Sequence, residues 1–123
     1  DVKIAGVEIL YMPEKQNLID AVNRLCAENN IGVNDIDLLV TGRNKNKENN
    51  KVYDDFENIF NMKDKSESYK DIFGESFTTS AYSVCYAYEC LKKGITPSGR
   101  KVKNILLYNH YENKDHSLIL LIC

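Results

Sequence analysis

The stretch SFTTSAYSVCYAY, residues 76–88, decides how this chain folds. It forms the middle of a predicted helix over residues 72–93, which Gly94 ends, with Pro97 just beyond. No residue of the stretch is charged, whereas a helix at the surface of a globular domain normally carries a charged side. We therefore expect this helix to be buried on nearly all sides.

The length of the chain makes such burial difficult. With 123 residues and three predicted helices, a single domain has too few layers to enclose one helix completely. An exposed apolar patch of several hundred Å² usually marks an interface. We expect a partner to cover the helix: a second copy, a sister chain, or a missing half of the same polypeptide. The alternative is that the Ser and Thr hydroxyls make this side an acceptable surface.

The remaining pattern predicts an α/β domain with the element order β-α-β-α-α-β-β, in which helices pack on a mixed sheet. The first helix is expected to begin at Pro13 and Glu14 and to end near Asn29, with an apolar stripe between them. Polar loops are expected at 42–51 and 63–69. The strands are expected over residues 2–10, 38–40, 102–108 and 118–123, and the second helix over residues 52–60.

Composition excludes several classes of protein. The formal net charge of −2 argues against a general binder of nucleic acid or anionic membranes. No apolar run is long enough to span a bilayer, and no signal peptide is visible. The four cysteines form no C-x-x-C pair and indicate reduced thiols in a cytoplasmic protein. Because the chain starts at Asp1, we expect a fragment or a trimmed chain.

Several marks resemble the C-terminal half of the β-ketoacyl synthases, condensing enzymes of the thiolase-like superfamily. An Asp-Ile-Asp segment, 35–37, leads into a strand. Lys70 is followed four residues later by Gly74 at the head of the uncharged helix. Gly94 and Pro97 follow that helix, and the pair Asn109 and Tyr111 precedes the last strand. The resemblance runs from residue 35 to 122 almost without gaps, and residues 5–34 fit the segment before it.

The resemblance implies that residues 1–123 are one thiolase-like half-fold. In that family two similar halves pack as five layers, and the uncharged helix lies in the central layer. The nucleophilic cysteine belongs to the other half, so we assign no catalytic role to Cys85 or Cys90, which we interpret as core thiols.

Departures from the family pattern bear on function. Gly42 and Glu75 occupy the positions of the two family histidines, which stabilise the developing enolate and oxyanion. Glycine has no side-chain donor, and a carboxylate would repel the developing negative charge. The turn 112–115 also lacks the family's glycines, and His116 matches a turn histidine outside the catalytic set. Only Lys70 survives among the family's catalytic residues, and we expect the chain alone to be inactive.

Other polar groups are candidates for sites, and each has a simpler interpretation. His110 and His116 lie near Glu112 and Asp115, but their spacing is not that of a zinc site, so we favour a solvated turn. The basic segment 43–47 could meet the acidic surface of an acyl carrier protein, and we favour a solvated loop.

Two further sequence features bear on catalysis and on ligands. Asp35 and Asp37 could form an acid/base pair, and we favour a role in a turn. The nucleotide-binding motifs are absent, and we expect no cofactor and no metal.

Three hypotheses for function remain open. The chain is a degenerate synthase half that serves as a non-catalytic partner subunit, as Gly42 and Glu75 favour. It is an excised half of a longer synthase-like protein of fatty-acid or polyketide biosynthesis, even an active one whose cysteine lies in the missing half. Or it is a module that binds acyl carrier protein or acyl chains near Lys70. A homo- or hetero-oligomer with a synthase-like chain is expected in the first two cases.

Overall fold

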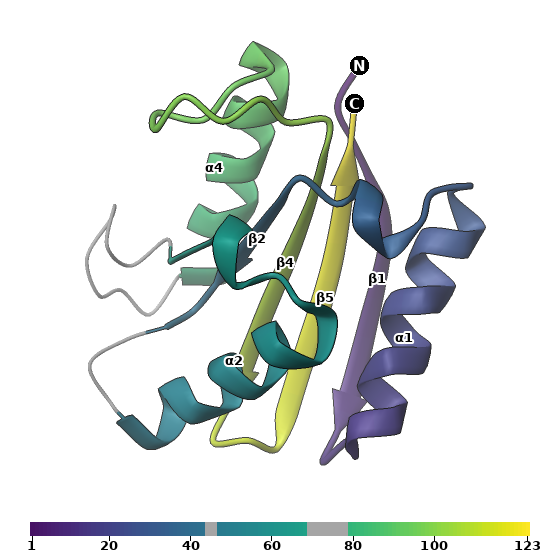
Figure 1. Cartoon of the computed structure of the whole chain (residues 1–123), viewed down its shortest axis with the longest axis vertical. Coiled ribbons are helices and arrows are strands. Elements are labelled where there is room, and N and C mark those ends of the chain that lie inside the picture. Colours follow the sequence, from purple (N-terminus) through teal and green to yellow (C-terminus); the bar gives the residue numbers. More distant parts are fainter. Residues whose placement is uncertain (44–46, 69–78) are drawn as a thin grey trace.

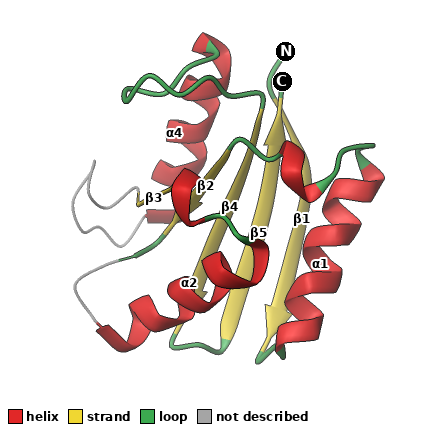
Figure 2. Cartoon of the chain, viewed as in Figure 1, coloured by secondary structure: helices red, strands yellow, loops and turns green. Residues whose placement is uncertain are grey.

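A computed structural model describes residues 1–43, 47–68 and 79–123 of the chain. Its centre is a five-stranded mixed sheet with the strand order β1-β5-β4-β2-β3 (Figures 1 and 2). Strands β2, β3 and β4 are mutually parallel, and β5 runs antiparallel to both β1 and β4. The elements are β1 (Lys3–Tyr11), α1 (Lys15–Glu28), β2 (Leu38–Thr41), α2 (Lys47–Phe60), β3 (Ser66–Ser68), α4 (Thr79–Lys93), β4 (Asn104–Tyr111) and β5 (Asp115–Ile122). The predicted α/β architecture with helices on a mixed sheet is confirmed.

The helices divide between the two faces of the sheet. Because side chains alternate along a strand, Leu106 and Leu107 of β4 point to opposite faces. Leu106 joins the core under α1 and α2, whereas Leu107 joins the core under α4. We call these the front face and the back face. Figure 2 shows α1 and α2 lying over the same side of the sheet.

Helix α1 packs closely on β1. Its side toward the sheet carries a buried stripe: Leu18, Ala21, Val22, Leu25 and Cys26. Gly6 of β1 lies under this stripe, where a Cβ atom would come within 2.6 Å of Leu25 Cδ2. The β1–β5 register shifts between Ile4 and Gly6, so the pairing of β1 is irregular where α1 packs on Gly6. The helix begins at Lys15, so the prediction that Pro13 and Glu14 form its first turn is wrong. Glu14 is instead the residue before the helix, and its backbone N–H donates to Asn17 Oδ1 at 2.8 Å.

Two chain reversals agree with the sequence prediction. Gly94 ends α4 with φ at +74°, in the left-handed region that favours glycine. Strands β4 and β5 correspond to the strands expected over residues 102–108 and 118–123, and they form a hairpin with Glu112 and Asn113 at positive φ in its turn.

Two predicted loops contain regular structure instead. Helix α2 begins at Lys47 rather than Val52, and Lys47, Glu48 and Lys51 in this added part are exposed. The predicted loop over 63–69 contains β3, which pairs with β2 through Leu39–Ser66 and Thr41–Ser68. The strand has no apolar side chain, so alternation could not reveal it. Of the long helix predicted over 72–93, residues 72–78 lie outside the described residues.

In the chain alone, α4 is not buried on all sides. Tyr86, Ala87 and Cys90 are buried against the sheet, but Cys85 and Tyr88 on another side of the helix are exposed. The interpretation of Cys85 as a core thiol is therefore wrong for the isolated chain, while the same interpretation of Cys90 is confirmed. No described helix combines the length and apolar character needed to cross a membrane.

Beside α4, part of the back face is left uncovered by the described residues, and we call it the open face. It comprises the exposed side chains Ile4, Val7, Ile9 and Tyr11 of β1, the half-buried Ile119 of β5, and the exposed Tyr111 of β4. The β1 side chains of this set lie on the back face because of their pairing with β5. Their partners are Leu121, Ile119, Ser117 and Asp115. These partners alternate along β5 with the front-face residues Leu118 and Leu120.

Candidate functional site

The candidate site lies at the carboxyl ends of β2 and β3. These ends meet at one edge of the sheet because the two strands are parallel. Gly42 follows β2 directly and is buried. This is the position at which the family resemblance places a catalytic histidine. The backbone at this point therefore presents no side-chain donor.

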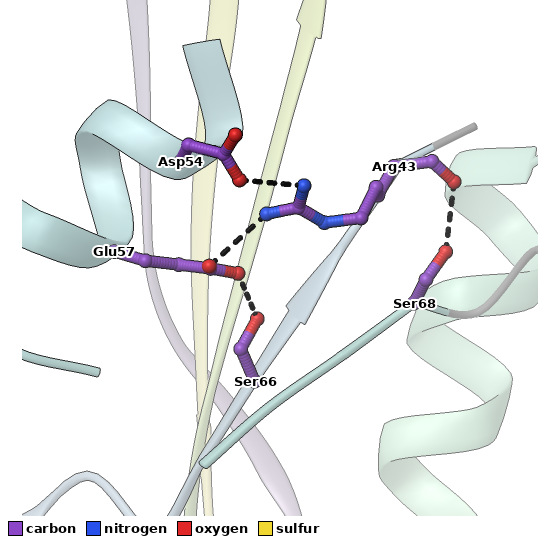
Figure 3. Close-up of polar contacts among 5 residues, drawn as sticks. All are labelled: Arg43, Asp54, Glu57, Ser66 and Ser68. Atoms are coloured by element: carbon purple, nitrogen blue, oxygen red, sulfur yellow. Dashed lines mark hydrogen bonds and ion pairs between the residues drawn. The ribbon is translucent and has the colours of Figure 1, made fainter. Parts of the chain in front are cut away.

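Arg43, the next residue, lies between two carboxylates of α2 (Figure 3). Its Nη1 lies 2.7 Å from Asp54 Oδ1, and its Nη2 lies 3.0 Å from Glu57 Oε1. Ser66 of β3 donates a hydrogen bond to the other oxygen of Glu57. Ser68 donates to the carbonyl of Arg43 at 2.8 Å. These contacts join the end of β2, the strand β3 and the helix α2.

The two carboxylates differ in burial. The Asp54 side chain is 57% exposed, whereas that of Glu57 is only 7% exposed. Burial by itself disfavours the charge on Arg43, but its hydrogen bonds to Asp54 and Glu57 outweigh that effect and raise the pKa of Arg43. Both oxygens of Glu57 have a partner. The guanidinium is thus engaged within the protein and is a positioning group rather than a free donor for a substrate oxyanion.

On the other side of β3, Glu67 forms a second polar contact set. Tyr86 of α4 donates to Glu67 Oε2 at 2.8 Å, and Ser98 donates to Oε1 at 3.1 Å. Burial, and then the hydrogen bond to this carboxylate, raise the pKa of Tyr86, so the phenol stays protonated and remains a donor. Together with Arg43 and Glu57, these residues line a groove of ≈ 570 Å³ around the β3 edge.

A buried network follows at the carboxyl end of β4. The Tyr108 hydroxyl lies 2.7 Å from His116 Nδ1, and His116 Nε2 lies 3.1 Å from Asn113 Oδ1. His116 is 2% exposed, and burial lowers its pKa below the ordinary value. Burial raises the pKa of Tyr108. A protonated phenol donating to a neutral imidazole, which in turn donates to the Asn113 amide oxygen, satisfies each group.

The network also explains the two histidines considered for a metal. The prediction that His116 lies in a solvated turn is wrong, because its ring is enclosed between Tyr108 and Asn113. His110 Nδ1 accepts a hydrogen bond from the backbone N–H of Asn113 at 3.1 Å, and its ring packs on Tyr53. Over the described ranges, no three His, Cys, Asp or Glu side chains converge into a metal-binding group.

The other predicted site residues have mixed outcomes. Lys70, Gly74 and Glu75 lie outside the described residues. The prediction that segment 43–47 is a solvated loop is wrong at Arg43, which is held in ion pairs, and at Lys47, which begins α2.

The predicted role in a turn is confirmed for Asp35 and is wrong for Asp37, which bonds a distant segment of the chain. Asp35 accepts from the Gly32 N–H, and Asp37 accepts from the N–H groups of Lys103 and Asn104. Asp37 therefore anchors the chain before β4 rather than serving in an acid/base pair.

Sequence reasoning missed the cluster of Arg43 with Asp54, Glu57 and Ser66. One signal was available, because Asp54 and Glu57 are three residues apart and lie on one side of a helix. Nothing in the sequence placed that side over the end of β2. The role of Tyr108 was missed as well, although the hairpin sets it close to His116.

Comparison with solved structures shows the fold. The chain is similar to the crystal structure of 3-oxoacyl-[acyl-carrier-protein] synthase III from Aquifex aeolicus VF5, with a TM-score of 0.61 and 11% sequence identity. The similarity covers 99% of this chain and 45% of that chain, so this chain spans less than half of that protein's length. No protein-family model matches the sequence. No curated protein matches it either. The chain thus has a thiolase-like fold.

Proposed function

We propose that this chain is a catalytically degenerate β-ketoacyl-synthase-like domain that acts by association with another thiolase-like half. In this role it is a partner subunit, or one half of a larger assembly, in fatty-acid or polyketide-type biosynthesis. The similar synthase from Aquifex aeolicus VF5 supports the choice of pathway class, since the structural similarity covers 99% of the residues of this chain.

The observation that carries the proposal is the chemistry at the end of β2. Decarboxylative condensation needs donors aimed at the oxygen that becomes negative, and removal of one such donor costs about 100- to 1,000-fold in rate. Here Gly42 supplies no side chain, and the guanidinium of Arg43 is bonded to Asp54 and Glu57. An added oxyanion would have to displace carboxylates that already neutralise the arginine. This end of the strand therefore offers a poor oxyanion site.

The open face supports the association. Its apolar side chains are exposed beside a helix whose described exposed side includes the uncharged Cys85 and Tyr88. A contiguous apolar area of this kind is characteristic of interaction surfaces. A second thiolase-like half would cover it with a helix. The catalytic cysteine and the missing donors would then belong to the partner or to no chain at all.

The test is decarboxylation of malonyl-acyl carrier protein by the purified chain, followed as release of carbon dioxide, with an authentic 3-oxoacyl synthase as positive control. We expect no rate above the uncatalysed background. Turnover by the wild-type chain that is lost in Lys70→Ala would refute the degenerate assignment and would identify an active half.

A further inference from the structure

Two exposed tyrosines and an aspartate lie side by side at one end of the sheet. In the strand register Tyr11 of β1 pairs with Asp115 of β5, and Tyr111 of β4 pairs with the same Asp115 from the other side. We call these three residues the tyrosine–aspartate row. Because residues paired directly across two strands point to the same face of the sheet, all three side chains lie on the back face. The row therefore forms one end of the open face.

The side chains of the row are accessible to a ligand. Tyr11 is 70% exposed, Tyr111 is 67% exposed, and Asp115 is exposed as well. Within the described ranges Asp115 has no ion-pair partner. Neither tyrosine ring packs on another aromatic ring of those ranges. The row thus offers a carboxylate flanked by two aromatic rings.

Hydrogen bonds hold the backbone around the row in place. Met12, directly after Tyr11, donates its N–H to the carbonyl of Lys114 at 2.6 Å, and Lys114 directly precedes Asp115. The N–H of Lys114 in turn donates to the carbonyl of Tyr111 at 2.9 Å and closes the turn between β4 and β5. The three members of the row are therefore fixed relative to one another before any ligand binds, and ordering them costs little backbone entropy.

The spacing of the row suits a flat ligand. Strand β5 lies between β1 and β4, so the backbones that carry the two tyrosines are two strand spacings, or about 10 Å, apart. A flat group in contact with one ring on each side needs about 7 Å between the rings, because carbon atoms in contact lie about 3.5 Å apart. Rotation of two exposed side chains closes this difference. The row can therefore hold one planar group between its rings, above the carboxylate.

The chemistry of the row favours a guanidinium. An arginine side chain is planar, always charged and weakly hydrated, and it stacks on aromatic faces. Its N–H groups form a fork that matches a carboxylate, and the two faces of the tyrosine rings attract a cation. A lysine ammonium is a compact and strongly hydrated charge with no flat face, so it would use the carboxylate of Asp115 but not the spacing of the two rings.

Apolar side chains continue from the row along β1. Ile9 is 79% exposed and Val7 is 50% exposed, and both share the back face with Tyr11. A small free cation would contact the row and leave these side chains in water. A protein partner that presents an arginine beside its own apolar side chains would cover both, and the removal of Ile9 and Val7 from water would add to its affinity.

We propose that the tyrosine–aspartate row binds the guanidinium of an arginine side chain that a protein partner presents to the open face. Tyr11 and Tyr111 lie on either side of the guanidinium, and Asp115 is its counter-ion. The inference rests on the proposed association for the source of the arginine. Its test needs neither a partner nor turnover, so failure of the row to bind arginine leaves the decarboxylation result as it stands.

The first measurement is an NMR titration of the ¹⁵N-labelled chain with the capped amino acid acetyl-arginine-amide. We expect a dissociation constant of about 1–10 mM, with shift changes centred on the backbone amides of Tyr11, Tyr111 and Asp115. Acetyl-lysine-amide should bind about five-fold more weakly. Acetyl-citrulline-amide, which keeps the flat shape of arginine but has no charge, should cause no change at these amides.

Variants of the row test each of its parts. Asp115→Asn should weaken binding of acetyl-arginine-amide by about ten-fold, and Tyr11→Ala by about three-fold. Glu112→Gln removes an exposed carboxylate of the same turn, and Tyr88→Ala removes an exposed tyrosine of α4. These two matched controls should change the dissociation constant by less than about two-fold. The spectrum of each variant without ligand shows whether it is folded.

The source of the arginine is tested with the peptide acetyl-Leu-Leu-Arg-amide. It should bind about ten-fold more tightly than acetyl-arginine-amide, and Ile9→Ser should remove most of that gain without affecting the capped amino acid. Equal affinities would contradict a protein partner and indicate a small free cation. The site itself would be refuted by unchanged amides up to about 50 mM ligand, by equal binding of citrulline, or by full affinity in Asp115→Asn.

Discussion

The buried His116 should make the stability of the fold depend on pH in a defined window. Its folded-state pKa is lowered by burial, while in the unfolded chain it returns to the ordinary value near 6.5. Between these two values the unfolded state binds the proton and the folded state does not. Stability is therefore fully present above pH ~6.5 and is lost as the pH falls through the window toward the folded-state pKa.

The magnitude follows from a single proton. Within the window, one histidine changes the free energy of unfolding by at most about 1.4 kcal/mol per pH unit. We expect His116 to account for about 1 kcal/mol of lost stability between pH 7 and pH 5.5. For a domain of 123 residues this corresponds to a fall in Tm of about 3–5 °C.

The assay is urea unfolding at both pH values for wild type and His116→Gln. Glutamine keeps a hydrogen-bonding amide near Tyr108 and Asn113 but does not titrate in this range. The variant is expected to be less stable than wild type at pH 7, and its stability should fall less than that of wild type on acidification. Equal falls in the two proteins would show that His116 is protonated as easily in the folded state as in the unfolded state. The account of its burial would then be wrong.

Two other predictions concern single side chains and the backbone. Arg43→Met leaves the buried carboxylate of Glu57 without its cation and should lower the free energy of unfolding by about 3 kcal/mol. Asp54→Asn removes an exposed carboxylate of the same cluster and should lower it by less than about 1 kcal/mol. Similar losses in urea unfolding would contradict the difference in burial. Gly94→Ala should lower the free energy of unfolding by about 1–2 kcal/mol because φ is +74°. The control Gly32→Ala, at φ −95°, should change the melting temperature by less than about 2 °C. A Gly94→Ala variant as stable as wild type would show that the left-handed turn is not required.

Much of the fold could be predicted from the sequence, because the core elements have clear periodicity. The apolar stripe of α1 and the continuous apolar run of β5 identify their elements directly. Strand β3 could not be predicted in this way, since Ser66 and Glu67 are stabilised by polar partners on α2 and α4, and Ser68 by the carbonyl of Arg43. Those partners come together only when the whole sheet has formed.

The candidate site was less predictable than the fold. The interpretation of Gly42 as the position of a family histidine depends entirely on comparison with a family pattern. The ion pair of Arg43 with Glu57 depends on α2 folding back over the end of β2, and no local sequence pattern predicts that geometry. A polar turn predicts a surface position for His116, because such turns usually lie at the surface. The burial of His116 comes from packing beside Tyr108.

The pairing of β1 with β5 has a consequence for how the chain reaches its native state. The register joins Lys3 to Ile122, so the first described strand pairs with the last described strand. Such pairing gives the fold a high contact order and slows its formation. Until β5 leaves the ribosome, β1 has no strand beside it, and its apolar side chains depend on α1 alone or on a chaperone for protection. The sheet therefore closes in a late step, and deletion of β5 (Asp115–Ile122) would remove the strand that links β1 to the rest of the domain.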